Sequence, residues 1–106
     1  GLGNLTVVID RNRLQILGST EDVLGLEPFA DKWRAFGFET REVNGHDLHQ
    51  LAEAIEFAIQ FKGGPVMILC DTVKGKGVDF MEGKPDWHYG GLSSELVEKA
   101  KQIAGA

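Results

Sequence analysis

The order of apolar periods along this 106-residue chain predicts an α/β fold, a three-layer α/β/α arrangement around a parallel sheet. Three observations lead to it. Apolar runs at residues 5–9 and 66–70 are typical of buried strands. Segments with a helical repeat stand between and after these runs, and turns containing glycine or proline separate them. Strands and helices that alternate at this spacing are typical of parallel strands joined by right-handed crossovers.

The first strand is predicted within residues 5–16, LTVVIDRNRLQI. Five apolar or β-branched residues open it, and the run turns polar at Asp10, Arg11 and Asn12. A continuous apolar run that ends in a polar turn predicts a strand buried on both faces. Ligands collect beyond the carboxyl ends of parallel strands, and the amide oxygen of Asn12 suits Mg²⁺. The alternative is a polar strand exit with an Asx-type turn.

A polar connection and a helix are predicted next. Within residues 17–22, LGSTED, Ser19 or Thr20 can cap a short turn. Pro28 suits the first turn of a helix that extends to about residue 36, and Gly37 is the predicted cap at its end. Three aromatic residues at spacings of four and three predict one apolar face packed in the core. They are Phe29, Trp33 and Phe36.

Two strands and two helices complete the order. Residues 38–43 alternate enough for a short strand, residues 46–61 carry a strong helical repeat, and residues 66–70 predict a second, fully buried strand. Residues 71–89 have no clear period, and residues 95–104 predict a last helix. The predicted apolar face of the 46–61 helix consists of Leu48, Leu51, Ala52, Ile55, Ala58 and Ile59. Three strands would leave exposed sheet edges unless more sheet covers them.

Composition excludes several classes of partner. The formal net charge of −5 argues against nucleic acid or an anionic membrane as the main partner. No apolar run approaches the 18 residues or so that a membrane span needs, so we expect none. The single cysteine, Cys70, excludes a disulfide within the chain. We expect it to be a small buried hydrophobe, in a protein of the reducing cytoplasm.

Two more stretches are candidates for chemistry. In residues 74–77, Lys-Gly-Lys-Gly, glycines would let backbone N–H groups approach an anion and lysines would add charge; the alternative is a solvated basic loop. His88 lies beside Trp87 and Tyr89. It can serve as an acid, as a base or as a hydrogen-bond donor to a phosphate; the alternative is a packed loop histidine. No nucleophile, base and acid occur at a telling spacing. The sequence therefore favours a bound cofactor that supplies the chemistry.

Three stretches together resemble the thiamine-diphosphate domain of transketolase. They are VVIDRNRLQILGSTEDV, LEPFADKWRAFGFETREVNGHDLHQL and CDTVKGKGVDFMEGKPDWH, in the family's order and with family-like spacing. The resemblance covers nearly the whole chain and is closest to the N-terminal subunit of split transketolases, in which two chains make up the enzyme. It implies the thiamine-diphosphate-binding fold.

The resemblance also implies site residues. Asn12 matches a Mg²⁺ ligand that binds through its side chain, and Leu14 matches a residue that gives its backbone carbonyl to the same ion. Gly75 and Gly77 match a glycine loop beside thiamine diphosphate. His88 matches a histidine near the diphosphate and the substrate channel, with cofactor-binding and catalytic roles.

This chain departs from the family in three ways. Arg11 stands where the family often has Asn or Tyr, and Tyr89 begins a run that differs from the family's Gly-Lys-Ala-Pro. No Gly-Asp-Gly, whose aspartate holds the Mg²⁺, occurs in the 106 residues, and no aminopyrimidine-binding domain is present. Residues 1–106 are therefore expected to form a partial domain, the latter half of the diphosphate-binding domain.

The implied activity is ketol transfer between ketose and aldose phosphates, dependent on thiamine diphosphate and Mg²⁺. We expect no turnover from the chain alone. A pyrimidine-binding domain or subunit would complete the site in a dimer or other oligomer, with sugar phosphates as substrates. The alternatives are a non-catalytic assembly or interaction module with a vestigial cofactor site, or a piece of an enzyme like 1-deoxyxylulose-5-phosphate synthase, which shares the Lys-Gly-Lys-Gly loop.

Overall fold

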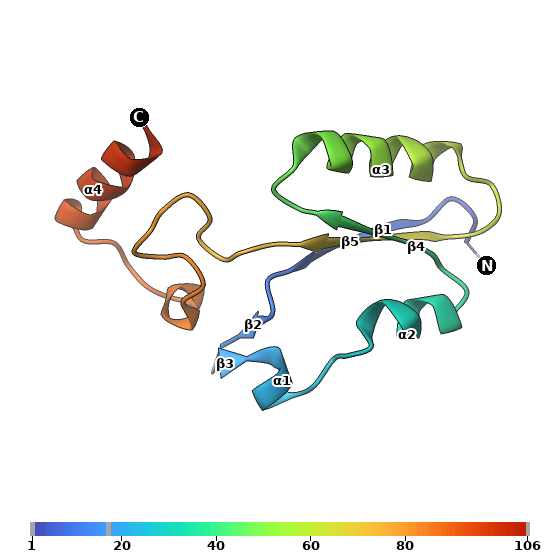
Figure 1. The fold of residues 1–106 in the computed structure, drawn as a ribbon, viewed down its shortest axis with the longest axis horizontal. Helices are drawn as coiled ribbons and strands as arrows, with labels where there is room; N and C mark the ends of the chain where they lie inside the picture. Colours follow the sequence, from blue (N-terminus) through green and yellow to red (C-terminus); the bar gives the residue numbers. More distant parts are fainter. Residues whose placement is uncertain (1, 17, 106) are drawn as a thin grey trace. The chain divides into compact units, whose positions relative to one another are not determined.

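The computed structural model describes residues 2–16 and 18–105 and divides into two compact units (Figure 1). The first, here called the sheet unit, comprises the residues up to Arg11 together with Leu26–Thr72. The second, the loop unit, comprises Asn12–Gly25 and the residues from Val73 onward. Leu17, which belongs to the predicted connection after the first strand, lies outside the described residues, as do Gly1 and Ala106.

Three parallel strands form the sheet. Strands β1 (Thr6–Arg11) and β4 (Glu39–Asn44) flank β5 (Val66–Asp71), so the order is β1-β5-β4. Both outer strands run parallel to β5, with Val8 of β1 and Arg41 of β4 opposite Ile68. The predicted parallel sheet is confirmed.

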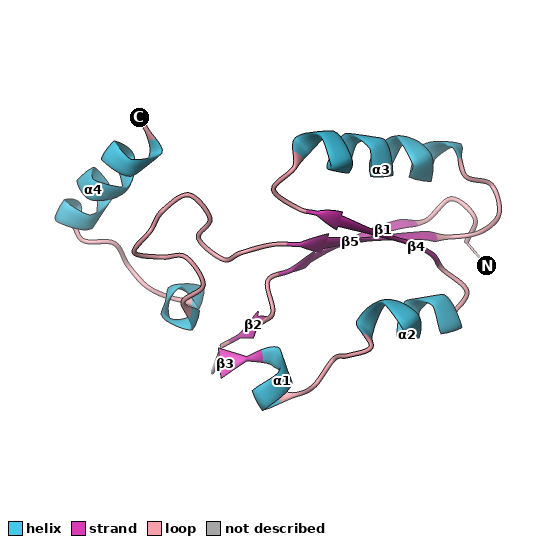
Figure 2. Cartoon of the chain, viewed as in Figure 1, coloured by secondary structure: helices cyan, strands magenta, loops and turns pink. Residues whose placement is uncertain are grey.

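Helices cover the two faces of this sheet. Helix α3 (Leu48–Gln60) lies on one face and α2 (Phe29–Ala35) on the other (Figures 1 and 2). The core forms where α3 meets β5, and its buried members are Ala54, Ala58, Val66, Ile68 and Cys70. Residues 66–70 are all buried, as their continuous apolar run predicts. The three-layer α/β/α prediction is confirmed.

The prediction that the first strand is buried on both faces is wrong. Exposed and half-buried residues alternate along β1, and Val8 keeps 56% of its surface exposed. The cause is position, because β1 is the outer strand of the described sheet and only β5 pairs with it. An apolar run indicates a strand that can be buried. The neighbouring strands and helices determine how much of its surface is buried.

Helix α2 corrects the predicted aromatic face. It ends at Ala35, so Phe36 falls beyond the last helical residue and is 83% exposed. Phe38 takes the predicted place, since its ring centroid lies 4.9 Å from that of Trp33 in an edge-to-face contact. Phe29 also meets Trp33, at 6.4 Å. Gly37 has a φ of 88°, which confirms the predicted glycine at the helix end.

Helix α3 begins at Leu48, two residues after the start of the predicted helical segment. The Asp47 side chain caps it by accepting hydrogen bonds from the backbone N–H groups of His49 and Gln50. The predicted apolar face is only partly correct, because apolar residues occupy two adjoining sides and one side meets the sheet. The members that remain exposed are Leu48 (81%), Ile59 (69%) and Ile55 (47%).

The loop unit holds short elements and one longer helix. A two-stranded antiparallel ladder, which the sequence did not predict, pairs β2 (Leu14–Gln15) with β3 (Gly18–Ser19). Of the two predicted cap residues, Ser19 caps the one-turn helix α1 (Thr20–Val23) and Thr20 is its first residue. The 3₁₀ turn η1 (Pro85–His88) interrupts the long irregular segment, and α4 (Ser94–Ala104) confirms the last helix.

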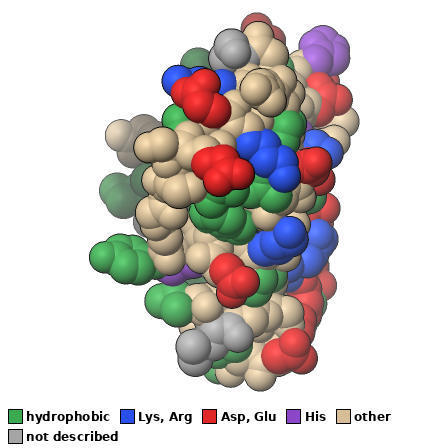
Figure 3. Space-filling model, turned by 90° about the vertical axis from the view of Figure 1, so that its left-hand side faces the viewer, with side chains coloured by type: hydrophobic (Ala, Val, Ile, Leu, Met, Phe, Trp, Pro, Cys, Tyr) green, Lys and Arg blue, Asp and Glu red, His purple; other side chains and the backbone are tan. Residues whose placement is uncertain are grey.

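The surface mixes charge of both signs. Figure 3 shows acidic and basic side chains side by side on the face it presents, with hydrophobic side chains between them. No helix in the described ranges, 2–16 and 18–105, has the length and apolar character to cross a membrane.

Replacing Ile68 with alanine is expected to lower the free energy of unfolding by about 2–5 kcal/mol. Ile68 is fully buried in the central strand, so truncation removes apolar contacts and leaves a cavity. Urea unfolding monitored by circular dichroism measures the change. Ile55→Ala is the matched control, because Ile55 is 47% exposed and should lose far less. Equal losses in both variants would contradict the placement of the core.

Candidate functional site

The predicted metal residues form a tight turn immediately after β1. The Asn12 side-chain oxygen Oδ1 accepts a hydrogen bond from the backbone N–H of Leu14 at 2.9 Å. Arg13, between them, has a positive φ of 57°, and its carbonyl accepts from the N–H of Thr20 at 2.9 Å. This is the Asx-type turn that the sequence offered as the alternative. It uses one of two lone pairs on Oδ1, so the oxygen keeps capacity for a cation.

The glycine loop already holds an anionic group. Gly77 has a φ of 91°, and its N–H donates to the Glu82 carboxylate at 2.9 Å. The Lys76 ammonium lies 3.9 Å from the same carboxylate oxygen. The loop therefore offers an anion one backbone donor and one cation, which is the chemistry expected of a phosphate cradle. Sequence reasoning missed Glu82, although an acid shortly after paired glycines and lysines was a usable signal.

Gly75 is fixed by space as well as by backbone angle. Its φ is 72°, and a Cβ there would lie 2.6 Å from the Cβ of Met81 and 2.9 Å from the backbone carbonyl carbon of Met81. The loop folds back on itself at this point, since the N–H of Gly83 donates to the carbonyl of Lys74 at 2.9 Å. Only glycine fits so close an approach.

His88 ends η1, and its own side chain is exposed. The residue before it is anchored, because the indole N–H of Trp87 donates to the Phe80 carbonyl at 3.1 Å and the two rings meet at 5.7 Å. The Lys99 ammonium covers the Phe80 ring at 5.3 Å. This packing holds the backbone of η1 while the imidazole stays open to solvent.

The loop unit gathers the predicted site residues, although they come from distant parts of the sequence. All of them belong to this unit, and within it β2 and η1 are in contact. The strand that contains Leu14 therefore lies against the turn that ends in His88. The set comprises Asn12, Leu14, Gly75, Gly77 and His88. Each of these assignments remains a prediction.

The carboxyl ends of β1 and β5 are tied together beside Cys70. The Thr72 hydroxyl donates to the Asp10 carboxylate. Burial raises the pKa of the Cys70 thiol, and the charge on Asp10 raises it further. The thiol stays protonated and buried, which confirms Cys70 as a small hydrophobe. In the part of the chain that the structure describes, no three His, Cys, Asp or Glu side chains gather as a metal site.

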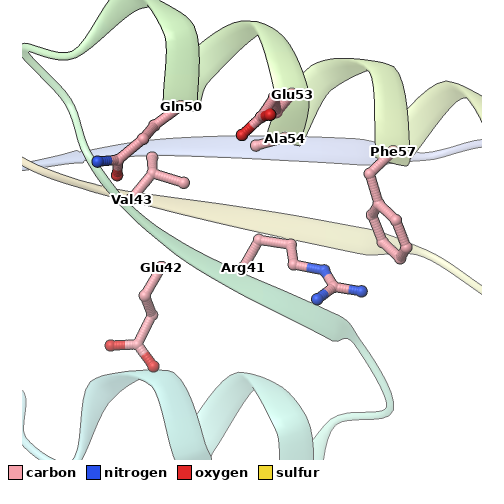
Figure 4. Close-up of a pocket in the computed structure, with 7 residues that line it drawn as sticks. All are labelled: Arg41, Glu42, Val43, Gln50, Glu53, Ala54 and Phe57. Carbon is pink, nitrogen blue, oxygen red and sulfur yellow. The ribbon is translucent and has the colours of Figure 1, made fainter.

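A surface hollow lies elsewhere, within the sheet unit between β4 and α3 (Figure 4). Its volume is about 370 Å³, and the Arg41 guanidinium stacks 3.8 Å from the centroid of the Phe57 ring at its wall. None of the predicted site residues lines it. The lining residues are Arg41, Glu42, Val43, Gln50, Glu53, Ala54 and Phe57.

Replacing Glu82 with glutamine is expected to strengthen diphosphate binding about fivefold, provided that the glycine loop is the diphosphate cradle. The Glu82 carboxylate occupies the Gly77 N–H and would repel a second anion, an effect of roughly 1 kcal/mol at 4 Å in water. Titration of inorganic pyrophosphate at low and high salt measures it. Glu98→Gln is the control, since Glu98 pairs with Lys101 at 2.9 Å on α4. Unchanged affinity in Glu82→Gln would remove the loop from the site.

The fold defines a class, the three-layer α/β domain that places ligand-binding loops after the carboxyl ends of parallel strands. Comparison with known proteins gives the family. The sequence profile described as "Transketolase, thiamine diphosphate binding domain" matches residues 1–106. The chain belongs to the transketolase family and forms part of its thiamine diphosphate binding domain.

Three of the similar curated proteins are named as transketolase subunits. The chain is 39% identical over 99 residues to one subunit of the apulose-4-phosphate transketolase of Actinobacillus succinogenes, and the match covers 93% of this chain and 36% of the relative. It is 41% identical over 99 residues to the 6-deoxy-6-sulfo-D-fructose transketolase subunit SqwG of a Clostridium species, covering 93% and 36%. The chain thus spans about a third of the length of these relatives.

Solved structures agree on the fold. Transketolase from Campylobacter jejuni superposes with a TM-score of 0.85 at 30% sequence identity, covering 97% of this chain and 16% of that one. Transketolase from Leishmania mexicana gives 0.85 at 32% identity, covering 95% and 15%. The predicted family and fold are confirmed.

Proposed function

We propose that this chain supplies the diphosphate and Mg²⁺ side of the cofactor site of a split transketolase. The enzyme would move a two-carbon ketol unit from a ketose phosphate to an aldose phosphate. A second subunit would supply the pyrimidine-binding part, in an oligomer that works in the cytoplasm. The names of the relatives, which are subunits of apulose-4-phosphate and sulfofructose transketolases, support this assignment.

The observation that carries the proposal is the makeup of the loop unit. An amide oxygen with a spare lone pair at Asn12, an anion-holding loop at Gly77, and the His88 turn against β2 occur in one compact unit. These are the groups that a Mg²⁺-diphosphate cofactor requires, namely hard oxygen ligands for the cation and N–H donors for the anion. The donor set therefore fits the cofactor.

Each residue has a separate role in the proposal. Asn12 would bind Mg²⁺ through Oδ1, and Leu14 would bind it through its carbonyl oxygen. Gly75 gives the loop its close turn, and the N–H of Gly77 would donate to the diphosphate. His88, exposed on an anchored turn, would donate to the diphosphate or the substrate. Bound thiamine diphosphate would supply the carbanion chemistry of ketol transfer.

The test is ketol transfer by the assembled enzyme that contains this chain and its partner subunit. We expect transfer between a ketose phosphate and an aldose phosphate that stops when thiamine diphosphate or Mg²⁺ is removed and returns when both are added. The chain without its partner should show no turnover. Transfer that persists after complete cofactor removal would overturn the proposal. An assembly that forms but neither binds the cofactor nor turns over would favour the non-catalytic module instead.

A further inference from the structure

The chain crosses from one unit to the other three times, and these crossings are called passages here. Arg11 stands at the first passage and contacts a residue at or near each of the other two. The passages fall at Arg11–Asn12, Gly25–Leu26 and Thr72–Val73. Arg11 itself stands at the first. Its guanidinium forms an ion pair with Glu27, two residues beyond the second passage. Its carbonyl accepts a hydrogen bond from the N–H of Thr72, at the third passage, at 3.1 Å.

The partners of Arg11 are themselves fixed. One carboxylate oxygen of Glu27 meets the guanidinium, and the other accepts from the N–H of Phe29 at 3.0 Å. The guanidinium also lies 5.5 Å from the centroid of the Phe29 ring, within cation–π range. The hydroxyl of Thr72 donates to Asp10, the residue before Arg11. The start of the α2 segment and the ends of β1 and β5 are thereby joined.

Stability alone does not favour this arrangement. The Arg11 side chain is only 10% exposed, and Glu27 is 49% exposed. Among the described residues, the buried Nε of Arg11 has no hydrogen-bond partner. Burying the charged Arg11 guanidinium costs desolvation that an apolar side chain of similar size avoids, and an unpaired buried N–H adds to that cost. A charge kept at such a position calls for an explanation other than folding energy.

We propose that Arg11 is a positioning residue for the cofactor site. By holding the points where residues 12–25 and 73–105 leave the sheet unit, it would fix the Asn12 turn and the start of the glycine loop. It would not touch the cofactor. This inference rests on the proposed function, because it gives Arg11 a role only if Asn12 and the glycine loop bind Mg²⁺ and diphosphate.

The test compares Arg11→Met and Glu27→Gln in the assembled enzyme by calorimetric titration of thiamine diphosphate with Mg²⁺. We expect about tenfold weaker binding in each, which is the scale of removing a group that orients a ligand. The double variant should bind no more weakly than either single one, because both remove the same link. Amide hydrogen exchange should rise at residues 12–16 and 73–77 more than elsewhere in the chain.

Matched controls separate positioning from general loss of an ion pair. Arg34 pairs with Glu42 at 2.8 Å in the same sheet unit, away from the three passages, so Arg34→Met should leave the affinity unchanged. An equal loss in Arg34→Met would overturn the inference. If Arg11→Met unfolds the chain, Glu27→Gln carries the test, since it keeps the shape of a half-exposed side chain.

Asn12→Ala separates failure of this inference from failure of the proposed function. Full affinity in Arg11→Met and Glu27→Gln, with affinity lost in Asn12→Ala, overturns the role of Arg11 and leaves the proposed function standing. Full affinity in Asn12→Ala as well overturns the metal assignment, and with it the reason for the inference.

Discussion

Replacing Asn12 with alanine is expected to weaken Mg²⁺-dependent binding of thiamine diphosphate on the order of 100-fold. Removal of a group that merely orients a metal ligand costs about 10–100-fold, so loss of a ligand should reach the upper end. The change removes the amide oxygen and leaves the backbone of the turn with only its Leu14 hydrogen bond missing. Calorimetric titration of the assembled enzyme, with and without Mg²⁺, measures the affinity.

A matched control for this variant exists in the sheet unit. Asn44 Oδ1 accepts from the N–H of His46 at 3.0 Å, an Asx turn of the same kind that follows β4. Asn44→Ala therefore loses the same sort of hydrogen bond, at about 1 kcal/mol, without touching the proposed site. Its cofactor affinity should equal that of the unchanged protein. If both variants lose affinity equally, Asn12 acts through folding and not through the metal.

Replacing Gly75 with alanine should abolish cofactor binding while leaving the sheet unit folded. The added methyl would meet the backbone of Met81 at 2.9 Å, and backbone cannot rotate aside as a flexible side chain can. The positive φ of 72° adds about 1–3 kcal/mol of strain. The loop must open, and with it the N–H groups proposed to hold the diphosphate. Titration gives the affinity, and circular dichroism reports whether the sheet unit persists.

Gly83→Ala separates the steric clash with Met81 from the strain of a positive φ. Gly83 has a φ of 67°, close to that of Gly75, but a Cβ there would meet no atom within 4 Å. This variant should suffer the strain alone and lose only a few-fold in affinity. Equal loss in the two variants would mean that the backbone angle, and not the approach to Met81, shapes the loop.

The elements of the fold were predictable where local pattern and tertiary position agree. The central strand, residues 66–70, is apolar throughout because both of its faces and both of its edges are covered. Val8 lies in the same kind of apolar run, yet about half of its surface is exposed. An apolar run does not reveal whether another strand or helix covers it. The spacing of the aromatic residues predicts Phe36 on the apolar face only if the helix extends to residue 36, and α2 ends one residue earlier.

The candidate site divides in the same way. Asn12, the glycines and His88 could be proposed from the sequence, because special residue types at strand ends and in irregular segments carry local signals. Arg11 and Glu82 gain their importance from partners. The Arg11–Glu27 ion pair joins residues whose spacing in the sequence gives no sign of contact, whereas the Glu82–Gly77 hydrogen bond joins near neighbours in a loop whose conformation the local pattern does not predict. Such pairs are evident only in the three-dimensional structure.

The strand order has a consequence for how the protein is made. β1 and β4 do not pair with each other, and each takes its only described partner from β5, the last of the three in the chain. When residues up to 65 have been synthesised, β1 and β4 still lack the strand with which each pairs in the described sheet. Both ladders of the described sheet can therefore form only after residues 66–71 have been made. During that interval the apolar run of β1 is a target for chaperones, which bind such exposed segments before non-local pairing can hide them.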